Sequence, residues 1–232
     1  MLEYQGGYGG EIDEIKQGEH DLGYINSVFD RISKNLREDV AIYHIGGNAM
    51  CWYGLKETTK DVDLVLTGEG GIDSFRSAVL DSGFIEVDIV SVPGYEHINQ
   101  YAIFDEVRGI PLNQEFTPGL RVELFLDQIC GGFRFSGGMK SRCMRGEDRC
   151  LLREYFCSME DIFLFKSITE RERDLEDMYR IHRSKPDFEV IRAELRDQLD
   201  SMDVKTRMYL LESVKGSLDS LRERYGVSLE LL

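Results

Sequence analysis

Two aspartates, Asp61 and Asp63, stand one residue apart in the otherwise apolar run DVDLVL. Aspartate is a poor strand former, and its carboxylate is costly to bury. In an extended chain, residues i and i+2 project from the same face, so the two carboxylates would lie side by side and repel each other. A divalent cation removes that repulsion, and Mg²⁺ prefers carboxylate oxygens together with substrate phosphates. The pair therefore predicts a site for Mg²⁺ and a nucleotide.

Two adjacent glycines, Gly46 and Gly47, precede the aspartates at the end of the apolar segment VAIYHI. Glycine lets the backbone approach a ligand closely, and the N–H groups at the start of a helix favour phosphate. Asn48 adds a side-chain donor to the same turn. A glycine pair or an Asp-x-Asp pattern is common alone, but the order strand, Gly-Gly, short helix, Asp-x-Asp strand is much more specific. This order predicts a phosphate-binding turn beside the two carboxylates.

The apolar periodicities of the chain predict the elements that hold these residues. Strands are expected over 40–47 (ending in the glycine turn), 61–68, 84–90, 100–107 and 121–129, and helices over 20–36, 48–55 and 71–83. After residue 157 the pattern is helical, with helices expected over 158–183, 186–199 and 203–226 and Ser158 as the first N-cap. The expected organisation is a loose arm over residues 1–18, an α/β domain over 19–157 and a helical region over 158–232.

Composition and charge limit the functions that the chain can have. A formal net charge of −15 argues against nucleic-acid binding through the overall field. The segment 134–153 departs from this balance, because its charged residues are Arg134, Lys140, Arg142, Arg145, Arg149 and Arg153 against Glu147 and Asp148. This segment is expected either to receive RNA phosphates or to carry ordinary solvated loop charges.

Cysteine usage and the lack of apolar tracts indicate the compartment. The odd number of five cysteines argues against a disulfide framework, and free reduced thiols are expected. Cys143, Cys150 and Cys157 recur every seven residues, which is not the two-to-four-residue spacing that is usual for zinc ligands. Without a signal peptide or an apolar run of about 20 residues, a cytoplasmic protein with no membrane partner is expected.

The stretch GGNAMCWYGLKETTKDVDLVL resembles the nucleotidyltransferase superfamily with the polymerase-β catalytic fold, including Thr59 before the aspartates. Small prokaryotic members, among them nucleotidyltransferases of abortive-infection and toxin–antitoxin systems, are the most similar. They carry a later helix with a lysine and an Arg-x-x-Asp-type tail, which SMEDIFLFKSITERERDLEDMYRI resembles. The resemblance is clear over residues 40–66 and 158–181, and it implies a mixed, largely antiparallel sheet followed by helices.

The resemblance also implies a reaction and a set of site residues. The expected reaction transfers a nucleoside monophosphate from an NTP to an acceptor hydroxyl, with two Mg²⁺ ions held by Asp61, Asp63 and a third carboxylate. Glu123, in the apolar setting RVELFL, is the expected third acid; Asp127 is the reserve, and an ordinary strand glutamate is the alternative. The nucleotide-binding residues are expected to be Gly46, Gly47, Asn48, Thr59, Lys166 and Asp174.

Several alternatives remain open at this point. A surface salt-bridge ladder along the helix 158–183 would explain Lys166 without any nucleotide. The acceptor is expected to be RNA, a protein or a small alcohol such as an aminoglycoside, and an antitoxin-like protein partner is a further expectation. The rival function is a catalytically silent, nucleotide- or protein-binding regulator, which the glutamate at the third acid position keeps open.

Overall fold

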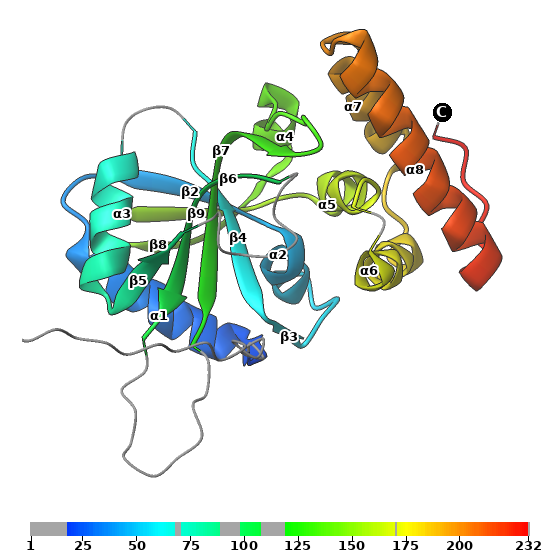
Figure 1. The fold of residues 1–232 in the computed structure, drawn as a ribbon. Helices are drawn as coiled ribbons and strands as arrows, with labels where there is room; N and C mark the ends of the chain where they lie inside the picture. The colour runs from blue at the N-terminus through cyan, green and yellow to red at the C-terminus, as the bar shows by residue number, and fades with distance from the viewer. Residues whose placement is uncertain (1–17, 68–70, 89–97, 108–118, 170, 232) are drawn as a thin grey trace, which may run out of the picture.

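A computed structural model describes residues 18–67, 71–88, 98–107, 119–169 and 171–231 (Figure 1). In these ranges the helices are α1 (Leu22–Asn35), α2 (Gly46–Trp52), α3 (Ile72–Asp81), α4 (Gly137–Arg142), α5 (Met159–Lys166), α6 (Glu172–Arg183), α7 (Phe188–Asp200) and α8 (Val204–Tyr225). The strands are β1 (His20–Asp21), β2 (Val40–Ile45), β3 (Thr58–Thr59), β4 (Asp61–Val65), β5 (Phe84–Val87), β6 (Ile98–Glu106), β7 (Arg121–Cys130), β8 (Met144–Arg149) and β9 (Leu152–Phe156). Residues 1–17 of the predicted arm lie outside the described residues.

Among the described residues, seven strands form one sheet in the order β5-β6-β7-β4-β2-β9-β8. The pairs β4–β7 and β2–β9 are parallel, and the remaining neighbours are antiparallel. The predicted α/β class with a mixed, largely antiparallel sheet is confirmed. Strand β4, which carries both aspartates, lies in the middle of the sheet between β7 and β2.

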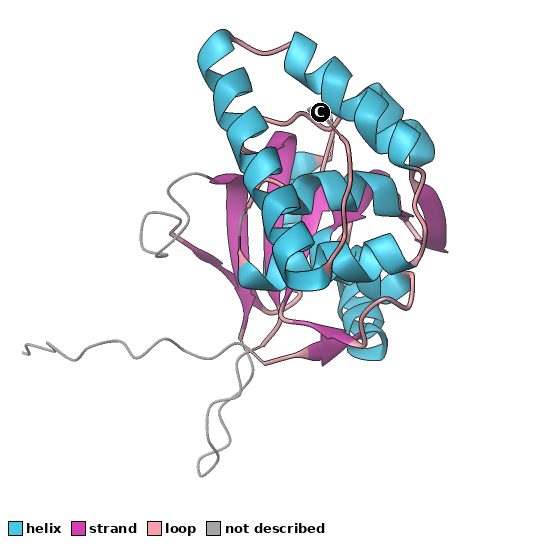
Figure 2. Ribbon diagram, turned by 90° about the vertical axis from the view of Figure 1, so that its right-hand side faces the viewer, coloured by secondary structure: helices cyan, strands magenta, loops and turns pink. Residues whose placement is uncertain are grey.

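Helices cover both faces of this sheet (Figures 1 and 2). On one face, α1 and α3 pack over a core that includes Val62 and Leu64 of β4. On the other face, α2 and α5 cover a second core that includes Val65. Since side chains alternate along a strand, Asp61 and Asp63 share the face of Val65 and project toward α2 and α5.

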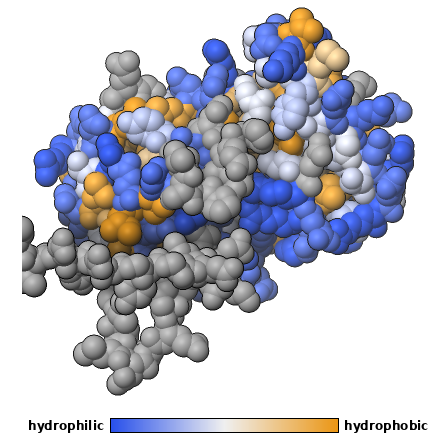
Figure 3. All heavy atoms as spheres, in the orientation of Figure 1, coloured by the Kyte–Doolittle hydropathy of each residue, from blue (hydrophilic) through white to orange (hydrophobic). Residues whose placement is uncertain are grey.

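The second core continues from the sheet into the C-terminal helices. It joins side chains of β7 and α5, such as Phe125 and Phe163, to Ile181 of α6, Leu195 of α7 and Leu210 of α8. Figure 1 shows these helices stacked beyond α5, on the side of the molecule away from α1 and α3. The surface over this fold is mainly hydrophilic on the face in Figure 3, with small separate hydrophobic patches.

The prediction of one continuous helix over 158–183 is wrong, although Ser158 is the N-cap, as expected. Helix α5 ends at Lys166 and α6 begins at Glu172. At the end of α5, the hydroxyl group of Ser167 donates to the backbone carbonyl of Leu164, a contact that competes with the helical pattern. The two helices also differ in which residues they bury: α5 buries five consecutive residues, whereas α6 buries residues along one face only. The break lets α6 pack against α5 instead of extending it.

Strands β8 and β9 were not predicted, because they lie in and just after the basic segment 134–153. The sequence of β8, MRGEDR, is polar and sits at the edge of the sheet, so it lacks the apolar alternation of a half-buried strand. The other five strands of this sheet were predicted, with ends that differ by a few residues. The two-residue strands β1 and β3, which pair with each other in a separate small sheet, were not predicted. None of the described helices has the length and apolar content that crossing a membrane requires.

Candidate functional site

The strand register brings three carboxylates together. In the parallel register of β4 and β7, Asp63 lies opposite Glu123, and Asp61 precedes Asp63 on the same face. Burial raises the pKa of Asp63 well above its usual value, and the carboxylates of Asp61 and Glu123 raise it further. Lys166 and Arg171 oppose this shift only in part. The three acids therefore form a group whose negative charges act on one another, as the sequence predicted for the aspartate pair.

Glu123 is held in place by a neighbouring strand. Its side chain is only 4% exposed, and the amide Nε2 of Gln100 on β6 donates to its Oε2 at 3.0 Å. Asp127, the reserve for the third acid, is exposed and does not line the cavity over the aspartates. Four residues along a strand amount to about 13 Å, too far for Asp127 to meet Asp63. The fold thus brings Glu123, and not Asp127, beside the aspartates.

The glycine turn packs directly against the acids. Gly46 has a left-handed φ of 62°, and a Cβ at this position would overlap the carboxylate of Asp63. A Cβ on Gly47 would overlap the hydroxyl of Thr59. The same hydroxyl donates to the backbone carbonyl of Asp61 at 3.0 Å. Both glycines and Thr59 line the cavity, so the structure places these predicted residues beside the two aspartates.

Asn48 lies elsewhere. Its side chain is 1% exposed, and its amide Nδ2 donates to Nδ1 of His44 at 2.7 Å. With Nδ1 as the acceptor, Nε2 of His44 donates to Glu154 at 2.9 Å, and Arg149 forms an ion pair with the same carboxylate. Burial and the positive charge of Arg149 lower the pKa of His44 to about 3, so the imidazole is neutral. The expected contact of Asn48 with a phosphate does not fit this buried position, which is not part of the cavity lining.

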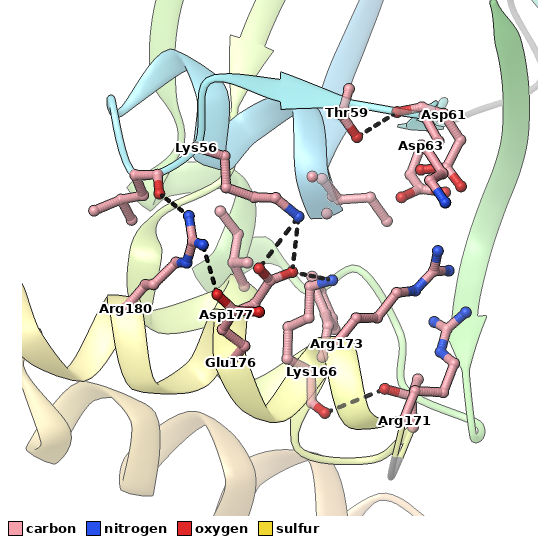
Figure 4. A pocket seen from close by; sticks show the side chains of 18 of the residues that line it. Lys56, Thr59, Asp61, Asp63, Lys166, Arg171, Arg173, Glu176, Asp177 and Arg180 are labelled. Carbon is pink, nitrogen blue, oxygen red and sulfur yellow. Dashed lines mark hydrogen bonds and ion pairs between the residues drawn. The ribbon is translucent and has the colours of Figure 1, made fainter. Parts of the chain in front are cut away.

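A cavity of about 730 Å³ opens over the three acids. Gly46, Gly47, Thr59, Asp61, Asp63 and Glu123 line it together with the cations Lys56, Lys60, Lys166, Arg171, Arg173 and Arg180. Figure 4 shows the guanidinium groups of Arg171 and Arg173 pointing across the cavity toward the aspartates. Arg171 also donates to Asp174 at 2.8 Å, whereas the described residues offer no hydrogen bond or ion pair to Arg173. Negative and positive groups thus face each other across one space.

Lys166 lines the same cavity but is already paired. Its Nζ lies 2.6 Å from Asp174 and 2.9 Å from Asp177, and the Nζ of Lys56 lies 3.2 Å from Asp177. Burial would lower the pKa of Lys166, but the two aspartates more than reverse this effect. Despite its own burial, Asp174 has its pKa lowered to about 2 by Lys166 and Arg171. The ion-pair alternative for Lys166 is therefore present, although it joins two helices rather than running along one.

Asp174 does not line the cavity, because its carboxylate accepts hydrogen bonds from Lys166, Thr169 and Arg171. It is 1% exposed and fixes the start of α6 against the end of α5. The predicted contact of Asp174 with a nucleotide stays a prediction, and its position favours an indirect one through Arg171.

The acids suit Mg²⁺ by their chemistry. No group of three or more His, Cys, Asp or Glu side chains within the described ranges is arranged as a ready metal site. Mg²⁺, however, is usually held by one or two carboxylates together with substrate phosphates and water, and not by an all-protein cage. The raised pKa of Asp63 fits this role, because a cation would remove the repulsion that raises it. The donor set therefore fits a magnesium ion that arrives with a nucleotide.

The basic segment 134–153 carries less free charge than its sequence indicates. Arg142 pairs with Asp161 and Glu194, Arg145 with Asp148, Arg149 with Asp30 and Glu154, and Arg153 with Asp39. Lys140 lies 5.8 Å from the centre of the Tyr43 ring. Four of the six basic side chains are thus paired with acids, three of them with acids from outside the segment, which weakens the expectation that it binds RNA.

Sequence reasoning missed Lys56 and Arg171 as cavity residues. Lys56 reaches the cavity from the segment between α2 and β3, and Arg171 from the N-cap of α6. Lys56 pairs with Asp177, which is far from it in the sequence. Arg171 pairs with Asp174 at the start of α6, which was not predicted to be the start of a helix. One signal was available, because the run RERDLED places basic and acidic residues together at the end of an apolar helix.

Comparison with known proteins adds little to this geometry. No family model matches the chain, and no curated protein matches it. Among solved structures, the chain is similar to an H. pylori protein described as a "putative nucleotidyltransferase", with 16% sequence identity and a TM-score of 0.39, over 88% of this chain and 98% of that one. A similarity of this size does not assign a function, so the function must be inferred from the site.

Proposed function

We propose that this chain is a nucleotidyltransferase, which transfers a nucleoside monophosphate from an NTP to an acceptor hydroxyl and releases pyrophosphate. One observation carries this function: the Asp61, Asp63 and Glu123 carboxylates share a cavity with the facing guanidinium groups of Arg171 and Arg173 (Figure 4). A nucleoside triphosphate with its magnesium needs both kinds of group, acids for the metal and cations for the phosphates. The Gly-Gly and Asp-x-Asp motifs resemble those of the nucleotidyltransferase superfamily, and this resemblance supports the same reaction.

The site residues would divide the work as follows. Asp61, Asp63 and Glu123 would hold Mg²⁺, expected as two ions. When bound, Mg²⁺ lowers the pKa of the attacking hydroxyl and stabilises negative charge on the leaving pyrophosphate. Gly46 and Gly47 would let the phosphates approach the backbone beside Asp63, where a side chain has no room.

The cations on the other side of the cavity would bind the triphosphate. Arg171 and Arg173 point toward the acids, and their planar groups can each form two hydrogen bonds to phosphate oxygens. Lys166 would contribute less direct charge than its sequence position indicates, because Asp174 and Asp177 already neutralise it. Its main role would be to fix α6, and with it Arg171 and Arg173, against α5.

We further propose that a polyanionic acceptor such as RNA would approach the rim of this cavity rather than the segment 134–153. Lys60 and Arg173 are exposed there and have no ion-pair partner among the described residues. A protein or a small alcohol remains an alternative acceptor. An antitoxin-like protein partner that covers the cavity would regulate access to it.

A specific observation favours a second candidate, a nucleotide-binding regulator without catalysis. Within the described ranges, the acids are not arranged as a ready three-ligand metal site, and the third acid is the longer glutamate. Such a protein would bind an NTP with Mg²⁺ but leave it intact. Binding and turnover must therefore be measured separately.

The test incubates the purified chain with each α-labelled NTP and Mg²⁺, first with total RNA and then with cell protein, and follows label transfer and pyrophosphate release. Glu123→Gln should lower the rate of transfer by orders of magnitude. Its Mg²⁺-dependent NTP binding, measured by thermal shift, should remain. Asp127→Asn, on the same strand but exposed and outside the cavity, is the matched control and should keep full activity. NTP binding without transfer to any acceptor would favour the regulator, and absence of both would overturn the nucleotide site.

A further inference from the structure

Two cysteines lie opposite each other where the β8–β9 hairpin begins and ends. Cys143 directly precedes β8 and Cys157 directly follows β9. In the antiparallel register Met144 is opposite Phe156, so Cys143 and Cys157 are the next pair outward. Their Sγ atoms are 3.9 Å apart, and both are free thiols. Neither side chain takes part in the proposed transferase site.

This placement meets the geometric needs of a disulfide. Directly opposed residues of an antiparallel pair have Cα atoms about 4.5–5.5 Å apart, within the range of about 4.4–6.8 Å that disulfides span. The sulfur atoms need to come closer, to about 2.05 Å. Cys143 now directs its thiol toward the carbonyl of Met139 at 3.3 Å, so a rotation of this side chain would close the gap.

An ion-pair clamp holds the two chain segments together independently of the thiols. Arg142, the neighbour of Cys143, lies 2.6 Å from Asp161 and 2.5 Å from Glu194. Asp161 belongs to the first turn of α5, which begins shortly after Cys157. Because the clamp fixes the segments, little further chain ordering is needed to join the sulfur atoms.

We propose that Cys143 and Cys157 form a redox pair that a hydroperoxide converts into an intramolecular disulfide. The thiolate of Cys143 would attack the peroxide, the O–O bond would break, and water or an alcohol would leave, which gives a sulfenic acid. The sulfur of Cys157 would then attack this sulfur, the S–O bond would break, and the thiol proton would leave with the hydroxide as water. Two thiols are oxidised and one peroxide is reduced.

Accessibility sets the order of these steps. Cys143 is half-buried, whereas Cys157 is fully buried. Burial and the neighbouring Cys143 raise the pKa of Cys157 well above its usual value. Peroxide therefore reaches Cys143 first, and Cys157 resolves the sulfenic acid from inside the protein.

The experiment treats the folded, reduced full chain with hydrogen peroxide, alkylates the remaining thiols and measures intact mass. Two of the five thiols should become resistant to alkylation, with the loss of two hydrogen atoms. Cleavage after lysine and arginine separates Cys143, Cys150 and Cys157 into the peptides 143–145, 150–153 and 154–166. A link between the first and third peptides is the expected product, and oxidation should raise the melting temperature because the unfolded chain is then constrained.

Variants and an unfolded sample make the result specific. Cys143→Ser and Cys157→Ala should each abolish the link and the rise in melting temperature, while Cys150→Ser, an exposed control in the same hairpin, should change neither. The same treatment in denaturant should lose the selectivity. Preferential links to Cys150, the same pattern of links in the folded and unfolded chain, or two unreacted thiols at 143 and 157 would each overturn the redox pair.

Discussion

Asp63 faces two other carboxylates and has a raised pKa, which predicts that its charge destabilises the metal-free fold. We expect Asp63→Asn to raise the unfolding free energy at neutral pH by on the order of 1 kcal/mol and to abolish nucleotide transfer. Because the folded pKa lies above the unfolded one, the wild type should lose stability as pH rises from about 4 through the raised value. The variant should lack this loss in urea titrations at several pH values. If Asp63→Asn instead sharply lowers the stability of the protein without metal, Asp63 has a structural role.

His44 gives a pH dependence of the opposite sign. Glu154 and Arg149 are the charged groups that face it, Asn48 is its neutral partner, and its folded pKa is about 3. The unfolded imidazole has a pKa of about 6.5, so this group contributes stability above that value and loses it as pH falls toward 3. Between about pH 6.5 and about pH 4.5, the unfolding free energy of the wild type should fall by about 2–3 kcal/mol more than that of His44→Gln. Parallel stability curves for the two proteins would show that His44 does not remain neutral.

At the scale of elements, the turn from β2 into α2 is tied to β4 by steric contact. Gly46→Ala should displace the Asp63 carboxylate, because its Cβ has no space there, and should also carry the strain of a left-handed φ. Gly83→Ala is the matched control, since Gly83 also has a positive φ but has open space around it. The control should cost about 1 kcal/mol of stability and no activity. Gly46→Ala should lower stability more than the control does and should lose Mg²⁺-dependent NTP binding. If the two variants have the same effects on stability and on NTP binding, the glycine turn is not part of the site.

Elements with a strong local signal could be predicted from the sequence, and so could the geometry that follows from them. The common face of Asp61 and Asp63 follows from strand alternation, and the position of the glycine turn follows from the end of the apolar run VAIYHI. The break between α5 and α6 could not be predicted in this way, because the hydroxyl contact of Ser167 with the backbone competes only weakly with a helix. The polar edge strand β8 gave no periodic signal either.

Long-range contacts explain what was missed at the site. Asn48 looks like a phosphate donor in sequence, but it is drawn into the core by His44, whose other nitrogen contacts Glu154 from β9. Arg149 similarly loses its free charge to acids that are distant in sequence. Such pairings depend on the order of strands in the sheet, which local patterns do not specify.

At the scale of the whole molecule, one core crosses the expected boundary between residues 157 and 158. It contains Phe125 of β7, Met139 of α4 and Phe163 of α5 together with Leu195 and Leu210 of the last two helices. The side chain of Gln198 also exchanges hydrogen bonds with the backbone of Arg134, at 3.1 Å and 2.8 Å. The helical region therefore covers the sheet face on which the acids lie.

This shared core predicts that the α/β part does not fold alone. A chain that ends at residue 157 would expose Phe125 and Met139, and we expect it to bind a hydrophobic dye and to unfold without a cooperative transition. The full chain should unfold in a single transition by circular dichroism and by tryptophan fluorescence. Supplying residues 158–232 as a separate chain during expression is the control, since it returns the missing cover and should restore cooperative unfolding. Cooperative unfolding of residues 1–157 alone would contradict the shared core and make the helical region an independent appendage.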